Sequence, residues 1–129
     1  MPKLVKKEKE GERSFLPHAI RAGSIAADFK ANHIRVLDVR ELTLIADCFM
    51  ICSVSSEPQL KAVYNGIRDQ MKEETGLRAL NTEGELSANW VILDYGALIV
   101  HIFREEAREF YDLDGLWGDA PEIDLELDS

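Results

Sequence analysis

The sequence has few of the features that mark secreted, membrane-bound or redox-active proteins. It holds two cysteines, three histidines and no apolar run near the roughly 18 residues that a membrane-spanning helix needs. Its first residues mix basic and acidic side chains, without the apolar core of a secretory signal or the acid-poor composition of a transit peptide. We therefore expect a cytoplasmic protein in which residues 1–16 are a disordered polar tail.

Positive charge is also scarce, because 15 Lys and Arg residues stand against 24 Asp and Glu residues, for a net charge of −9. Proteins that bind free nucleic acid usually carry a basic surface, so the charge argues against such binding. A basic protein is the partner that it favours. The charged residues of 112–129 are all acidic, so this stretch is either a solvated tail or part of an interaction surface.

The two cysteines lack the spacing of a disulfide. Cys48 and Cys52 lie in an apolar stretch that predicts a strand, in which their positions are roughly 13 Å apart. A disulfide needs Cα atoms within about 7 Å of each other. A metal-binding pair would need a helix here, which the apolar strand pattern disfavours. We interpret both as reduced core thiols, consistent with a cytosolic protein.

The helix and strand patterns predict one α/β (α+β) domain, with a mixed sheet of about five strands flanked by helices. The clearest helix start is Ser56 to Gln59, which has the form of a capping box with Pro58 in the first turn. We expect the domain to span residues 17–121, followed by an acidic C-terminal tail at 122–129. Helices are predicted at residues 17–30, 56–75 and 104–111, and strands at 34–39, 47–53, 77–81, 90–93 and 98–103.

The most apolar stretch of the chain is residues 89–117. Two apolar runs flank Asp94-Tyr95-Gly96-Ala97, which predicts a β-hairpin. Because the runs are apolar at nearly every position, both faces should be covered, or one should be a docking surface. If the aromatic side chains are buried they form an ordinary core, and if exposed beside acids they suit a basic protein partner. These aromatics are Trp90, Tyr95, Phe103, Phe110, Tyr111 and Trp117.

A catalytic or metal-binding constellation is not evident. The histidines, His18, His33 and His101, have no His or Cys partner at metal-ligand spacing. Serines at 53, 55 and 56 precede a helix whose backbone amides could hold an anion, but no glycine-rich turn or following lysine accompanies them. Helix capping is the better interpretation. We expect no catalytic residue, no metal and no cofactor.

Several motifs in order resemble the ribosomal silencing factor family, also called the Iojap family. They are VLDVR, DCFMICS, WVILDYG, VHIF and FYDLDGLWGDAP, in a match that spans about residues 20–121. The resemblance implies a fold with nucleotidyltransferase-like topology in a protein that is not an enzyme. It also implies a translational repressor that binds the large ribosomal subunit through ribosomal protein fourteen and blocks joining of the small subunit under nutrient limitation. The free chain would be a homodimer.

By motif position, the resemblance implies a partner-binding region. The large aromatics would supply apolar contact area, Asp94 and the Asp112/Asp114 pair would face Lys or Arg, and Gly96 would permit the turn. The implied residues are Trp90, Asp94, Tyr95, Gly96, His101, Tyr111, Leu113 and Trp117.

Two departures from the family pattern affect the choice between the functional hypotheses. Val54-Ser55-Ser56 stands where the family has Gly-Asn-Ser, and Ala97 stands where an acid is common. The first weakens the hypothesis of an Mg²⁺-dependent nucleotidyltransferase-like enzyme that holds phosphates at residues 53–56. The second removes a charge from the implied docking surface. A homodimeric scaffold module is the third hypothesis.

Overall fold

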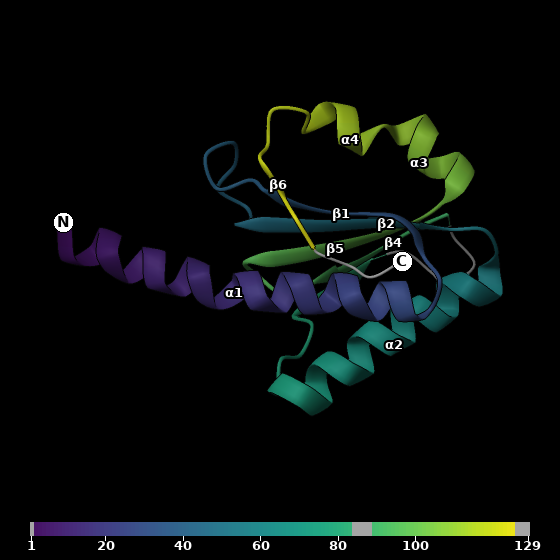
Figure 1. Ribbon diagram of the computed structural model, residues 1–129, viewed down its shortest axis with the longest axis horizontal. Helices are drawn as coiled ribbons and strands as arrows, with labels where there is room; N and C mark the ends of the chain where they lie inside the picture. Colours follow the sequence, from purple (N-terminus) through teal and green to yellow (C-terminus); the bar gives the residue numbers. More distant parts are fainter. Residues whose placement is uncertain (1, 84–88, 126–129) are drawn as a thin grey trace.

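The computed structural model of the chain describes residues 2–83 and 89–125. Helices cover both faces of one sheet, with α1 and α2 on one side and α3 and α4 on the other (Figure 1). The elements are α1 (Pro2–Asp28), β1 (Asn32–Asp38), β2 (Cys48–Val54), α2 (Glu57–Thr75), β3 (Asn81–Glu83), β4 (Trp90–Asp94), β5 (Leu98–Arg104), α3 (Glu105–Tyr111), α4 (Leu113–Leu116) and β6 (Glu122–Ile123).

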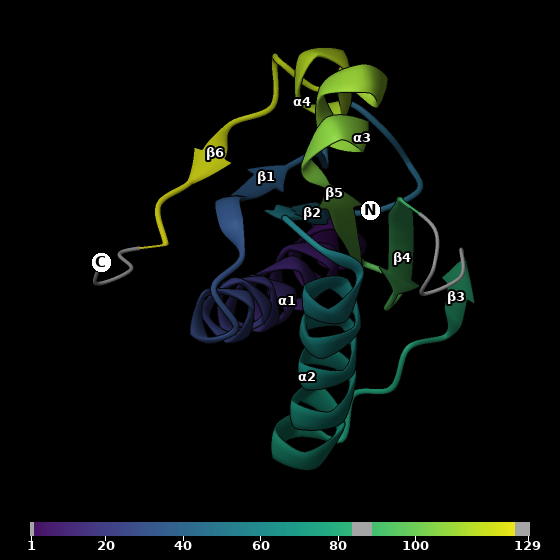
Figure 2. The ribbon, with the colours of Figure 1, turned by 90° about the vertical axis from the view of Figure 1, so that its right-hand side faces the viewer.

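The sheet is mixed, as the sequence predicts. Its order over the described residues is β3-β4-β5-β2-β1-β6, in which β2 and β5 are parallel and the other neighbouring pairs are antiparallel. The predicted hairpin is confirmed, since β4 and β5 pair around a turn in which the amide of Tyr95 donates to the carbonyl of Leu98 at 2.8 Å. Figure 2 shows the sheet between the two helical layers, with β6 and β3 at opposite edges.

Strand β6 contradicts the prediction that the segment after residue 121 is only an acidic tail. Ile123 of β6 pairs with Val36 of β1. The side chain of Leu125 packs against Gly23 of α1, so closely that a Cβ added to this glycine would lie 3.1 Å from it. Apolar residues at 123 and 125 alternate with acids, which is the period of an edge strand with one buried face. Residues 122–125 are therefore part of the packed fold.

Helix α1 is longer than the sequence pattern predicts. The predicted helix at residues 17–30 is its second half, and residues 2–16, predicted as a disordered tail, are helical. Pro17 lies inside the helix instead of at its start. Lys, Glu and Arg dominate the first residues, and their high helix propensity explains the extension. The buried positions Ala19, Ala22, Ile25 and Ala26 recur at helical spacing and face the sheet.

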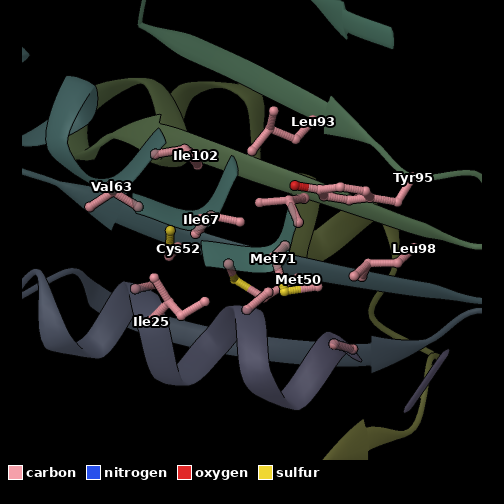
Figure 3. Close-up of a cluster of buried hydrophobic side chains, with 14 of the residues drawn as sticks. Ile25, Met50, Cys52, Val63, Ile67, Met71, Leu93, Tyr95, Leu98 and Ile102 are labelled. Atoms are coloured by element: carbon pink, nitrogen blue, oxygen red, sulfur yellow. The ribbon is translucent and has the colours of Figure 1, made fainter. Parts of the chain in front are cut away.

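Strand β2 is the centre of the core, because all seven of its residues are buried. Cys48 and Cys52 are reduced thiols on the face toward α1 and α2, which confirms the interpretation as core residues. Burial raises the pKa of the Cys52 thiol to about 12, so it stays protonated at neutral pH. Figure 3 shows Cys52 among apolar side chains contributed by both helices and the sheet.

Helix α2 begins where the capping signal predicts. The Ser56 hydroxyl accepts a hydrogen bond from the Gln59 amide at 3.2 Å. The side chain of Gln59 accepts from the Ser55 amide at 2.8 Å and donates to the carbonyls of Phe29 and Lys30. The capping residues thus also fasten α2 to the end of α1. At the other end, Gly76 has a φ of 76°, the left-handed conformation that ends many helices.

Loss of the Ser56 cap should be measurable. We expect Ser56→Ala to lower the free energy of unfolding by about 1 kcal/mol, because one amide of the first turn loses its acceptor. The matched variant Ser56→Asp keeps an acceptor and should remain close to wild type. Urea unfolding of the three proteins tests this, and equal midpoints for wild type and Ser56→Ala would contradict it.

Candidate protein-binding site

The two faces of the sheet are covered to different extents. The face toward α1 and α2 is a continuous buried core. On the other face, α3 and α4 lie over β1, β2 and the end of β5, while the side chains of β4 are only partly covered. We call the part near β4 the half-covered face and define it by Trp90, Ile92, Asp94 and Ile99, all of intermediate exposure, with His101.

Aromatic rings link β4 to α3 and α4 across this face. The Trp90 ring stacks on Phe103 with 4.8 Å between centroids and lies 5.0 Å from the ring of Tyr111. Phe49 of β2 lies between His101, at 4.8 Å, and Trp117, at 5.1 Å. We call these rings the aromatic array. Phe103 and Phe49 are buried in the core, whereas Tyr111 is 52% exposed and lies at the surface.

Most of the predicted site residues lie on this side of the sheet, but at different depths. Trp90 and Trp117 are half-buried and Tyr111 is exposed, whereas His101 and Leu113 are buried and can only support the surface. Trp90 therefore keeps part of its surface open to contact.

Two predicted residues belong to the β4–β5 turn. Tyr95 is 3% exposed and packs in the opposite core with α1 and α2, so the prediction that it supplies contact area is wrong for this conformation. Its hydroxyl has no hydrogen-bond partner among the described residues. Gly96 has a φ of 87°, a conformation that favours glycine, which agrees with its predicted role in the turn.

The acids predicted to face a partner make hydrogen bonds within the chain. Asp94 accepts from the Gly96 amide at 2.7 Å and so holds the turn. Asp112, with a φ of 48°, ends α3 and caps α4 by accepting from the Gly115 amide at 3.1 Å. Asp114 binds Arg108 and Arg35, each at 2.8 Å, and the Arg108 guanidinium foremost lowers the pKa of Asp114 to about 2. Asp114 is therefore a structural carboxylate.

Arg108 is the residue that sequence reasoning missed. It is 9% exposed and lies on α3, where its guanidinium binds both carboxylate oxygens of Asp114, at 3.0 and 2.8 Å. It also donates to the Ser53 hydroxyl at 2.8 Å and to the carbonyl of His33. These bonds join α3 and α4 to the ends of β1 and β2. The Asp114 partner is near in sequence, but no sequence signal connects Arg108 to Ser53.

His101 holds Trp90 in place and is neutral at physiological pH. Its Nδ1 atom accepts a hydrogen bond from Trp90 Nε1 at 3.3 Å, so the ring proton is on Nε2. Nε2 is buried without a partner among the described residues. Burial lowers the pKa of His101 to about 4. Protonation of the buried His101 ring would therefore destabilise the folded protein.

This burial predicts a pH dependence of stability. The folded-state pKa of His101 is below the ordinary value of 6.5, so the unfolded chain binds the proton first. The free energy of unfolding should therefore fall as the pH drops from about 6.5 to about 4. We expect His101→Phe to lose much of this slope in urea titrations at pH 7 and pH 4.5. Phe49→Leu, which alters a neighbouring ring without removing a titrating group, should keep it.

The remaining chemistry on the described residues gives little support to an enzyme. They contain no group of His, Cys, Asp or Glu side chains able to hold a metal ion. Ser53 and Ser56 are both engaged in internal hydrogen bonds. A cavity of about 370 Å³ at the ends of β2 and β5 is lined mainly by carboxylates, which would repel a nucleotide phosphate. Its lining residues are His33, Ser53, Glu105, Arg108, Glu109, Asp112 and Asp114.

These features define a class: a small α+β domain with a mixed sheet, helices on both faces and one partly covered aromatic face suited to contact with another protein. Across the described residues, none of the helices is both long and apolar enough to cross a membrane. The chain belongs to the ribosomal silencing factor family, since the family model described as "Ribosomal silencing factor during starvation" matches residues 12–129. The predicted family is confirmed, and the match extends beyond residue 121 to include β6.

Relatives support the same assignment. The chain is 39% identical over 106 residues to "Ribosomal silencing factor RsfS" of Bacillus subtilis, covering 82% of this chain and 89% of that one. It is 32% identical over 119 residues to "Protein Iojap, chloroplastic" of Arabidopsis thaliana, covering 92% of this chain and 49% of that protein.

Solved structures share the fold. A crystal structure of a Chromobacterium violaceum protein matches with a TM-score of 0.73 and 28% identity, covering 90% of this chain and 92% of that one. A crystal structure from Bacillus halodurans matches with a TM-score of 0.69 and 30% identity, covering 87% of this chain and 98% of that one. The α+β, single-domain fold class is therefore confirmed.

Proposed function

We propose that the chain is a non-enzymatic translational repressor that acts in the cytoplasm. It binds the large ribosomal subunit through ribosomal protein fourteen and sterically blocks joining of the small subunit, which slows translation under nutrient limitation. The observation that carries this proposal is the half-covered aromatic face on a strongly acidic member of the ribosomal silencing factor family. No cofactor or catalytic group is required, because occupancy of a surface is the mechanism.

The distribution of exposed apolar side chains supports a protein contact on this side. Large exposed apolar residues on the described part of the chain lie in α3, α4, the β1–β2 connection and the segment before β3, and none lies in α2. Phe110 and Leu116 are 81% and 72% exposed and lie on α3 and α4, beside the aromatic array. Tyr and Trp side chains contribute much of the binding energy at protein interfaces.

Charge favours a basic protein over ribosomal RNA as the direct contact. The net charge of −9 would repel a phosphate backbone and attract a surface rich in Lys and Arg. Because exposed charges are screened by salt, binding should weaken as ionic strength rises.

Co-sedimentation with isolated large ribosomal subunits tests the proposal. The chain should sediment with large subunits at moderate salt, and its addition before small subunits should reduce the fraction of joined ribosomes. Added after joining, it should bind much less, because the surface is already covered. Failure to bind large subunits at moderate salt would overturn the proposal.

The proposal includes a homodimer for the free chain, because the exposed apolar side chains of α3 and α4 would otherwise face water. Light scattering should give twice the 14.6 kDa mass of one chain at micromolar concentration. A monomer at all concentrations would remove the dimer from the proposal without affecting ribosome binding.

A further inference from the structure

We propose that the loop between β1 and β2, residues 39–47, is a second anchor that docks on a basic protein segment and takes one of its lysine side chains into an adjoining pocket. The inference rests on the proposed function, since the segment belongs to the surface of the large subunit. It adds a binding element beyond the partner-binding residues that the family resemblance implies.

The loop presents apolar side chains to water. Leu44 is 103% exposed, Ile45 is 66% exposed and Leu42 is 44% exposed. Three exposed aliphatic side chains within four positions form a local apolar patch, a feature that often marks an interaction site.

The loop is held in this conformation by its own hydrogen bonds. The amide of Val39 donates to the carbonyl of Asp47 at 2.9 Å, which closes the base. The amides of Leu42 and Thr43 donate to the Val39 carbonyl at 3.0 and 3.1 Å, and the Ile45 amide donates to the Thr43 hydroxyl at 3.2 Å. A loop that is ordered before binding loses less conformational entropy when its apolar side chains are covered.

The loop adjoins the half-covered face. The amides of Asp47 and Cys48 both donate to the carbonyl of Ala97 in the β4–β5 turn, at 2.8 and 2.9 Å. Asp94 and Ile99 pair with each other at this same end of the sheet. One partner can therefore contact the aromatic face and the loop together. Figure 1 shows the β1–β2 connection projecting from one end of the sheet, near the chain that leads into β6.

The pocket beside the loop indicates the chemistry of the occupant. It has a volume of about 300 Å³ and is lined by Asp38, Glu41, Leu42, Asp119 and Pro121. Asp38 is paired with Arg40, whereas the carboxylates of Glu41 and Asp119 have no partner among the described residues.

Leu42 and Pro121 line the pocket together with the acidic residues. A lysine bound there would lay its methylene stem on this apolar pair and place its ammonium group near the carboxylates. A phosphate backbone or a second copy of this acidic chain would add negative charge at this rim, so a basic protein segment is the favoured occupant.

Substitutions in the loop test the anchor without affecting the fold. Because the Leu44 side chain is fully exposed, Leu44→Ser should leave the unfolding midpoint unchanged and weaken binding to isolated large subunits about tenfold. Glu41→Lys should weaken binding most at low salt. Glu73→Lys makes the same charge change on α2, in the opposite helical layer, and should have a smaller effect. Wild-type binding by both loop variants would overturn the inference.

Cross-linking identifies the occupant. In Leu44→Cys, the introduced thiol is the reactive one under native conditions, because Cys48 and Cys52 are buried. After labelling with benzophenone maleimide and irradiation on large subunits, we expect a cross-link to a Lys- or Arg-rich peptide of a subunit protein. Cross-links only to RNA, only to a second copy, or to nothing while binding persists would overturn the inference alone. Absence of any large-subunit binding by the wild-type chain would overturn the proposed function as well.

Discussion

Replacement of Arg108 by Met should lower the free energy of unfolding by about 3 kcal/mol, because it removes a buried, multiply bonded charge. The Met side chain fills similar space but donates no hydrogen bond. The Ser53 hydroxyl then loses a donor in a buried setting, and the His33 carbonyl loses one in a partly buried setting. Asp114 keeps only its bond to Arg35. Urea unfolding at pH 7 measures the loss.

An exposed ion pair provides the control for this result. Arg68 binds Asp69 at 2.9 Å with side chains that are 46% and 61% exposed. Arg68→Met removes the same charge and should cost less than about 1 kcal/mol. If Arg108→Met also stays within that range, the network is not what fastens α3 and α4 to the sheet.

Replacement of Tyr111 by Ala should weaken binding to isolated large subunits by about 2 kcal/mol, or roughly thirtyfold. Tyr111 is half-exposed and lies at the outer end of the aromatic array, with its ring 5.0 Å from that of Trp90. Its loss removes apolar area from the proposed contact and frees Trp90 to move. Co-sedimentation at several chain concentrations gives the change in affinity.

Tyr64→Ala is the matched control. Tyr64 lies on α2, in the layer on the opposite side of the sheet, with Arg68 5.3 Å from its ring centroid. The change should reduce stability while leaving the affinity of the folded protein unchanged. Equal affinities for the two tyrosine variants would exclude the aromatic array as the contact.

Local sequence signals located most of the fold. The predicted helix at 56–75 is found at Glu57–Thr75, because its cap, its apolar period and its terminal glycine all act between near neighbours. The hairpin of β4 and β5 followed from two apolar runs and one turn. Strand β6 was not predicted, because the alternation of Ile123 and Leu125 with acids is too short to distinguish an edge strand from an acidic tail until β1 lies beside it.

In the candidate site, too, some features could be predicted from the sequence and others depended on tertiary contacts. Composition identified the aromatic stretch. The alternation of side chains along β4 decided which of its residues lie on the half-covered face and which are buried on the other side of the sheet. Trp90, Ile92 and Asp94 share one face of β4, and Tyr95 turns to the other, where it is buried. Asp114 appeared as a surface acid in the sequence and is instead held by Arg35 and Arg108.

The sequence by itself determined the family, the α+β class, the acidic charge and the position of the aromatic stretch, because these depend on composition and short-range order. Only the tertiary structure decided which aromatic side chains reach the surface and which acids remain available to a partner. Coverage of a sheet face depends on where α3 and α4 come to lie. Arg108 helps to hold that placement by donating to Ser53, 55 positions away in the chain, an interaction that no local pattern encodes.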